Sequence, residues 1–148
     1  MTLRHPPGLS PDGFELVGSL AIPRTRLRGT PPLALEAVLL RLTAIDGWQS
    51  RWLGSGLSST EEGILDAAPR DALRAVAEMR GSYVGVWDLL AWRDEQVLFI
   101  APKSAGTSAV SEAQAGWLAA ALVAGFTPED FLVAEQVDVR AELAALAR

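Results

Sequence analysis

Residues 84–103 read VGVWDLLAWRDEQVLFIAPK, and this stretch decides the fold. The residues of Tyr83–Trp92 and Gln96–Ala101 are mostly β-branched, aromatic and aliphatic, a composition typical of strands. The charged residues Arg93–Glu95 separate the two apolar runs and predict the turn of an antiparallel hairpin. Pro102 has no backbone N–H to donate, so the regular strand is expected to end or bulge there.

The register of this hairpin places a carboxylate at a defined position. With Asp94 and Glu95 at the turn, Asp88 is expected to face Ala101 across the two strands. Lys103 follows two residues later and returns to the same face if the strand continues. Asp88 and Lys103 should then approach each other. A carboxylate inside an apolar run needs a partner or an ion, because burying it alone is costly.

Hydrophobic spacing, caps and turn signals predict the remaining elements. A loose arm is expected over Met1–Gly13 and an extra strand over Phe14–Ile22. The others are helix Leu33–Ile45, strand Trp48–Leu53, helix Pro69–Met79, helix Ser111–Ala124 with Ser111 as cap, strand Phe131–Ala134 and helix Val139–Leu146.

The order of these elements predicts an α/β fold in which helices flank a mixed sheet. The strand–helix–strand passage from Val97 to Val133 is typical of a parallel crossover. Residues 1–29 are interpreted as an N-terminal arm with an edge strand, and residues 30–148 as one domain. A chain of 148 residues with 49% hydrophobic residues is long enough to bury a core without disulfides or a structural metal.

Composition excludes several kinds of site. The chain has no cysteine and one histidine. Thiolate zinc sites, cysteine nucleophiles, multi-histidine metal sites and a Ser-His-Asp triad are therefore not expected. Any metal chemistry would rely on carboxylates, which favour Mg²⁺ or Mn²⁺.

The charge balance limits the mode of nucleic-acid binding. A net charge of −5 argues against charge-driven coating of DNA, although not against a local basic groove. Arg24, Arg26 and Arg28 alternate and would share one side of an extended segment. They predict either an arm that contacts phosphates or a solvated edge that discourages aggregation.

No apolar run approaches the length of about 20 residues that a membrane-spanning helix needs. The N-terminal residues also lack the apolar core of a secretory signal. The sequence therefore predicts a cytoplasmic protein without membrane partners.

Five tryptophans lie within apolar elements. This placement favours packing in a core or an interface over stacking on bases. Trp48 and Trp52 share one strand face, and they are expected to cover either the first helix or the surface of a homodimer.

Three segments together resemble a nuclease family. They are Asp88–Leu90 (DLL), Val97–Lys103 (VLFIAPK) and Gln114–Leu118 (QAGWL). Their order and spacing resemble the VRR-NUC branch of the PD-(D/E)xK, or restriction-endonuclease-like, nucleases over about residues 33–135. The resemblance implies a helix–strand–strand–strand–helix–strand core.

The resemblance also implies roles for individual residues. Asp88 would bind a divalent ion, Lys103 would position or activate the attacking water, and Gln114 would open the helix of the site. Glu36 matches the acidic residue that the family carries on its first helix.

The sequence departs from the family at Ala101, where the family has the glutamate of its Glu-x-Lys motif. Trp87 also stands where the family has proline. A single aspartate with waters binds Mg²⁺ weakly, and metal-assisted hydrolysis needs that ion. Glu112 is either a second carboxylate that has moved to the following helix or a favourable charge at a helix N-terminus.

Three hypotheses about function follow. The first is a nuclease-fold protein with a degenerate metal site, which binds DNA or RNA with weak or no hydrolysis. The second is an active metal-dependent phosphodiesterase that uses Glu112. The third is a protein-interaction module without enzymatic activity. The sequence leaves open whether the protein is an enzyme.

Overall fold

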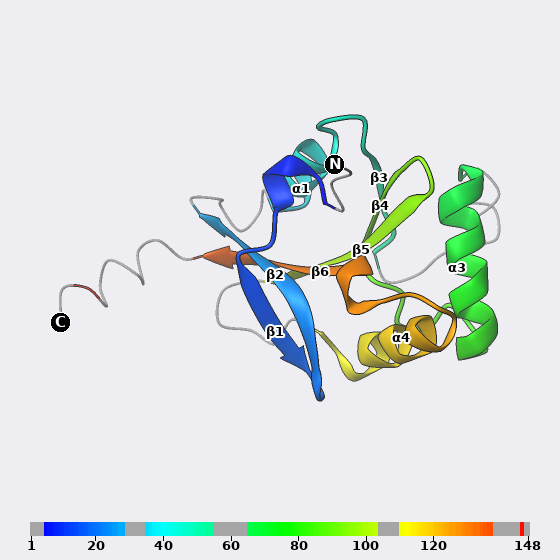
Figure 1. The fold of residues 1–148 in the computed structure, drawn as a ribbon. Helices are drawn as coiled ribbons and strands as arrows, with labels where there is room; N and C mark the ends of the chain where they lie inside the picture. The colour runs from blue at the N-terminus through cyan, green and yellow to red at the C-terminus, as the bar shows by residue number, and fades with distance from the viewer. Residues whose placement is uncertain (1–4, 29–34, 55–64, 104–109, 138–145, 147–148) are drawn as a thin grey trace.

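The computed structural model describes residues 5–28, 35–54, 65–103, 110–137 and 146 (Figure 1). Its described strands form one mixed sheet in the order β1-β2-β6-β5-β4-β3, where β6 is parallel to both β2 and β5. The strands are β1 (Gly13–Val17), β2 (Leu20–Arg28), β3 (Gln49–Trp52), β4 (Leu89–Arg93), β5 (Gln96–Lys103) and β6 (Phe131–Val137). The α-helices are α1 (Leu35–Thr43), α3 (Ala67–Arg80) and α4 (Glu112–Val123). The expected α/β class with a mixed sheet is confirmed.

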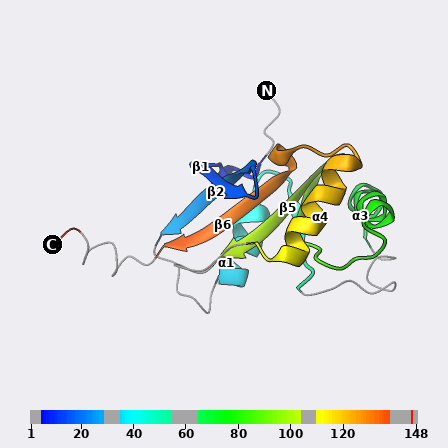
Figure 2. The same cartoon turned by 90° about the horizontal axis from the view of Figure 1, so that it is seen from below.

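The helices cover both faces of the sheet and create two apolar cores. On one face, α1 packs through Leu35 and Leu39 against residues of β4, β5 and β6. On the other face, α3 and α4 contribute buried residues such as Leu73 and Trp117. Figure 2 shows α1 and α4 on opposite sides of β5 and β6. A side chain on α1 is therefore separated by the sheet from a side chain on α4.

The central hairpin has the expected register. Leu90 pairs with Phe99, and Arg93 pairs with Gln96 across the turn. The prediction that regular structure ends at Pro102 is wrong, because β5 continues to Lys103 and pairs with β6. The pairing between β4 and β5 ends at Leu89 and Ile100, so the missing backbone N–H of Pro102 leaves no β4 residue without a donor.

The prediction of a strand from Tyr83 onward is wrong, because β4 begins only at Leu89. Gly81 and Gly85 both have positive φ, at 89° and 83°, and they turn the chain sharply. Added to Gly85, a Cβ atom would overlap the carbonyl oxygen of Ala113 in α4. Residues 81–88 are therefore a compact turn that packs directly against the start of α4.

The described N-terminal residues pack against the rest of the fold rather than forming a loose arm. Leu9 lies in a short 3₁₀ helix, η1 (Pro7–Leu9), and is fully buried in the core beside α1. The single extra strand expected over Phe14–Ile22 is instead the antiparallel pair β1–β2, with Gly18 at φ 63° in the turn. Because β1 pairs with β2 and β2 pairs with β6, the strands before position 29 belong to the same sheet as the other strands.

The other predicted elements are confirmed where the structure describes them. Helix α3 follows Asp66 and ends at Gly81, while α4 follows its cap Ser111. A second 3₁₀ helix, η3 (Pro128–Asp130), precedes β6. The expected helix Val139–Leu146 lies outside the described residues except for Leu146.

Four of the five tryptophans are buried, which confirms the packing interpretation. They are Trp48, Trp87, Trp92 and Trp117, all 7% exposed or less. Trp52 is partly exposed and packs with Trp48 in the core beneath α1. The two side chains on this strand face therefore cover the first helix.

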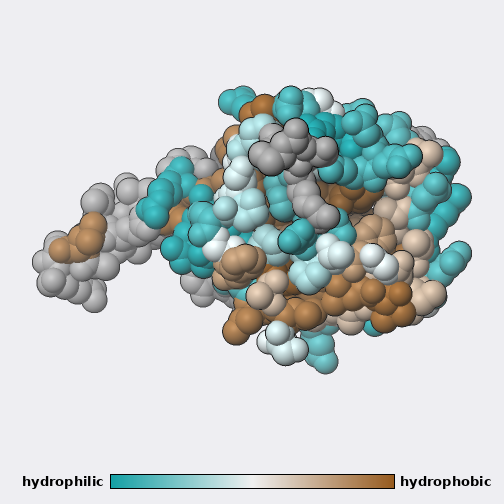
Figure 3. Space-filling model, in the orientation of Figure 1, coloured by the Kyte–Doolittle hydropathy of each residue, from teal (hydrophilic) through white to brown (hydrophobic). Residues whose placement is uncertain are grey.

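Helix α4 presents apolar residues to solvent as well as to the core. Val123 is exposed, and Figure 3 shows hydrophobic surface over α4. None of the helices in the described part of the chain combines the length and apolar character needed to span a bilayer.

Candidate functional site

Asp88 and Gln114 meet at the first turn of α4. Ser111 and Gln114 form a capping box: Ser111 Oγ accepts from the Gln114 backbone N–H at 3.1 Å, and Gln114 Oε1 accepts from the Ser111 N–H at 3.3 Å. The Gln114 side chain also hydrogen-bonds to Asp88. Since a carboxylate only accepts, the Gln114 amide N–H is the donor. The structure thus brings together two residues that the nuclease resemblance places in one site.

Trp87 holds this turn against α4. Its indole Nε1 donates to the main-chain oxygen of Gln114 at 3.1 Å, and its ring packs edge-on against Phe131 with centroids 4.9 Å apart. The buried tryptophan at position 87 therefore fixes the neighbouring Asp88 beside α4.

Burial raises the pKa of Asp88 above its ordinary value of 3.8, and the hydrogen bond from Gln114 opposes this shift only in part. Desolvation penalises the charged form of a carboxyl group. The carboxylate therefore lies in a site that disfavours its negative charge.

Lys103 has a different partner from the expected one. Its Nζ lies 2.6 Å from Glu15 Oε1, and the two side chains are only 16% and 20% exposed. Lys103 was expected to approach Asp88, but it pairs with Glu15 instead. The β1–β2 hairpin brings Glu15 to the sheet face that carries Lys103. Glu15 was not among the predicted site residues; its position in the alternating segment Phe14–Val17 was the available signal.

Glu112 and Lys103 line the same pocket. This pocket has a volume of about 380 Å³ and lies between the β1–β2 hairpin and the start of α4, with Glu15 and Ser111 in its walls. Glu112 is exposed in the first turn of α4. Two of the predicted site residues, one acidic and one basic, therefore line one pocket.

Glu36 does not join these residues. It is exposed on α1, which covers the opposite face of the sheet from α4. The expected carboxylate set of Glu36, Asp88 and Glu112 is accordingly divided between two faces. Within the described ranges, no group of three or more His, Cys, Asp or Glu side chains is placed to hold a metal ion.

Ala101 is fully buried beside Val133 of β6, in the core that α3 and α4 cover. The position where the resemblance implies a second carboxylate is therefore apolar and closed to solvent.

The three arginines of β2 share one side of the strand with acidic neighbours. Arg24 Nε lies 3.7 Å from Asp12 Oδ1, and its side chain is mostly buried. Arg26 and Arg28 are exposed, and Arg26 is the register partner of Glu135 on β6. The basic side chains thus form a mixed-charge surface rather than a purely basic stripe.

Comparisons with protein families, curated proteins and solved structures found no significant match to this chain. The site is therefore interpreted from its own geometry.

Replacing Asp88 with asparagine is expected to raise the melting temperature near neutral pH. The raised pKa means that the folded protein binds the Asp88 proton more tightly than the unfolded chain does. The stability contributed by this proton is complete below the ordinary value of 3.8 and is lost as the pH rises through the native pKa. Asparagine stays neutral and can still accept from Gln114.

Thermal melts of both proteins across acidic and neutral pH measure this effect. The gain from Asp88→Asn should shrink as the pH falls toward 3.8. The Glu36→Gln variant controls for loss of one negative charge at an exposed position. A gain that stays constant over the whole pH range would contradict the assignment to Asp88.

Proposed function

We propose that this chain is a nuclease-fold protein with a degenerate metal site, which binds nucleic acid with weak or no hydrolysis. The observation that carries the proposal is the hydrogen bond between the Asp88 and Gln114 side chains, two residues that the resemblance assigns to one site. The site is called degenerate because the buried Ala101 stands where the resemblance implies a second carboxylate. The order α1, β3, β4, β5, α4, β6 also agrees with the core that the resemblance to the VRR-NUC branch implies, apart from the inserted α3.

Weak hydrolysis follows from the charges around the site. Asp88 alone would supply one carboxylate to a divalent ion, and such a site binds Mg²⁺ or Mn²⁺ weakly. The Lys103 ammonium is already paired with Glu15, so its charge is offset by a carboxylate within the protein. Both features reduce the stabilisation available to a phosphodiester undergoing hydrolysis.

Arg26 and Arg28 are the best candidates for phosphate contacts. They are exposed on the same side of β2, at the sheet face that also carries Lys103. Few contacts and a negative net charge predict modest affinity with a shallow dependence on salt. Binding to nucleic acid would take place in the cytoplasm, the location that the sequence predicts.

The double variant Arg26→Ala/Arg28→Ala is expected to weaken binding of labelled DNA or RNA. Each lost phosphate contact should lower the slope of log affinity against log salt by about 1. Fluorescence anisotropy at several salt concentrations measures both quantities. The Arg41→Ala/Arg74→Ala variant removes the same charge from helices α1 and α3 and should bind like the parent protein.

Two results would overturn the proposal. One is the absence of binding to single-stranded or duplex DNA and RNA at low salt. The other is rapid Mg²⁺- or Mn²⁺-dependent cleavage that Asp88→Ala abolishes.

An active nuclease is the second candidate, and the pocket shared by Glu112 and Lys103 favours it. Cleavage that is lost in both Glu112→Gln and Asp88→Asn would support this function instead. We also propose a second copy of the chain as a partner under either function. The exposed Val123 and the hydrophobic surface over α4 support a contact there.

A further inference from the structure

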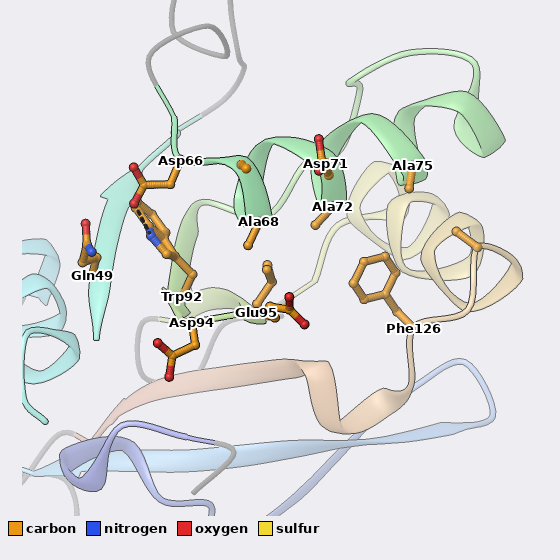
Figure 4. Close-up of a pocket in the computed structure, with 13 residues that line it drawn as sticks. Gln49, Asp66, Ala68, Asp71, Ala72, Ala75, Trp92, Asp94, Glu95 and Phe126 are labelled. Atoms are coloured by element: carbon orange, nitrogen blue, oxygen red, sulfur yellow. Dashed lines mark hydrogen bonds between the residues drawn. The ribbon is translucent and has the colours of Figure 1, made fainter. Parts of the chain in front are cut away.

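A second hollow lies at the end of β4 that is remote from Asp88. It has a volume of about 790 Å³ and lies open to solvent between α3, the β4–β5 hairpin and the residues after α4 (Figure 4). Its apolar walls include Ala68 and Ala72 of α3, Trp92 and Val97 of the hairpin, and Phe126. Asp88 precedes β4 whereas this hollow surrounds the end of β4, so the two sites are distinct.

The polar residues around this hollow are mainly acidic. Asp66, Asp71, Asp94 and Glu95 line it, and the described lining residues include no Lys, Arg or His. We call this site the acidic groove. A groove of apolar walls and carboxylates attracts cations and repels phosphates, so it does not belong to a nucleic-acid surface.

The carboxylates differ in whether they already have a hydrogen-bond or ion-pair partner within the protein. Asp66 Oδ2 accepts from Trp92 Nε1 at 3.0 Å, which fixes one wall of the groove. Asp71 has Arg70 at 3.9 Å. Asp94 and Glu95 lie at the exposed hairpin turn, where no ion pair to either forms within the described residues. Their charges remain available to a partner.

We propose that the acidic groove binds a basic segment of a partner protein. An apolar side chain of that segment would lie on the alanines of α3 and on Trp92, while flanking arginines or lysines would pair with Asp94, Glu95 and Asp66. The short alanine side chains allow a partner backbone to approach closely, and the complementary charges would favour encounter and set specificity. This inference is independent of the proposed nucleic-acid function.

A short peptide that alternates leucine with arginine is a suitable probe, and its counterpart carries glutamine at every arginine position. The arginine peptide is expected to bind saturably and to shift the ¹⁵N–¹H resonance of the Trp92 indole, which donates to Asp66. The buried indoles of Trp87 and Trp117 serve as internal references, since neither residue lines the groove.

Variants separate the contribution of charge from that of shape. Asp94→Asn/Glu95→Gln should lower the affinity about five-fold, the effect of losing two partly exposed ion pairs. Asparagine tolerates the positive φ of 53° at position 94. Glu36→Gln/Glu78→Gln removes the same charge away from the groove and should leave the affinity unchanged. Ala68→Leu fills the groove without changing charge and should also weaken binding.

The proposal is overturned if the arginine peptide does not bind, or if the glutamine peptide binds equally well. Equal losses in the two double variants would likewise overturn it, because they would show attraction to net charge alone. A Trp92 resonance that stays fixed while the peptide binds would place the contact elsewhere on the protein and would also overturn it.

Discussion

Replacing Ala101 with glutamate is expected to destabilise the protein strongly and to make its stability depend on Mn²⁺. Ala101 is fully buried and follows Ile100, the register partner of Leu89. The new carboxylate would therefore enter an apolar core at the end of the ladder where Asp88 precedes β4. An unpaired charge in such a position costs about 3–5 kcal/mol. A bound divalent ion would offset part of this cost by neutralising both carboxylates.

Thermal melts with and without Mn²⁺ test this prediction. An ion that binds only the folded state adds about 2.7 kcal/mol when its concentration is 100 times its dissociation constant. The Ala101→Gln variant has a side chain of nearly the same size without the charge. It should be destabilised by overpacking and by burial of its amide, and it should not respond to Mn²⁺.

Adding Asp88→Asn to Ala101→Glu should remove the response to Mn²⁺. A folded Ala101→Glu protein that gains no stability from Mn²⁺ would contradict the proposed nuclease kinship. Stabilisation of Ala101→Gln to the same extent would contradict the role of the carboxylate.

Gly85→Ala is expected to destabilise the protein by about 2–4 kcal/mol. The positive φ of Gly85 costs an alanine about 1 kcal/mol, and its Cβ would overlap the backbone of α4 at Ala113. Overpacking of this kind adds about 1–3 kcal/mol, because backbone atoms must move. The shift would also separate Asp88 from Gln114.

Gly81→Ala is the matched control for this substitution. Gly81 has a similar φ of 89°, but a Cβ there meets no atom of the described structure within 4 Å. Urea denaturation should therefore show a loss of only about 1 kcal/mol for Gly81→Ala. Equal losses of unfolding free energy in the two variants would mean that the overlap with Ala113 does not contribute to the destabilisation.

The central hairpin was the most predictable part of the fold. The apolar runs and the charged turn around Asp94 were sufficient to determine its register, since a shift by one residue would exchange the two faces of the sheet. The capped helices α3 and α4 were predictable for a similar reason, because Ser111 and Gly81 mark their ends locally.

The sequence did not reveal contacts that depend on long-range pairing. Local composition made Tyr83–Asp88 resemble a strand, whereas its shape depends on the fit of Gly85 against α4. The partner of Lys103 was missed because Glu15 lies 88 residues earlier in the chain and meets it only through the order of strands in the sheet. Glu36 was singled out by the resemblance to the nucleases, but the helix that carries it packs on the other face of the sheet.

The pairing of β2 with β6 has a consequence for how the chain reaches its folded state. Thr25 pairs with Ala134, so strands separated by roughly 100 residues must find each other before the sheet is complete. During synthesis, β2 leaves the ribosome roughly 100 residues before its partner β6. Until then its backbone edge stays open to pairing with other chains, so aggregation competes with folding during this interval.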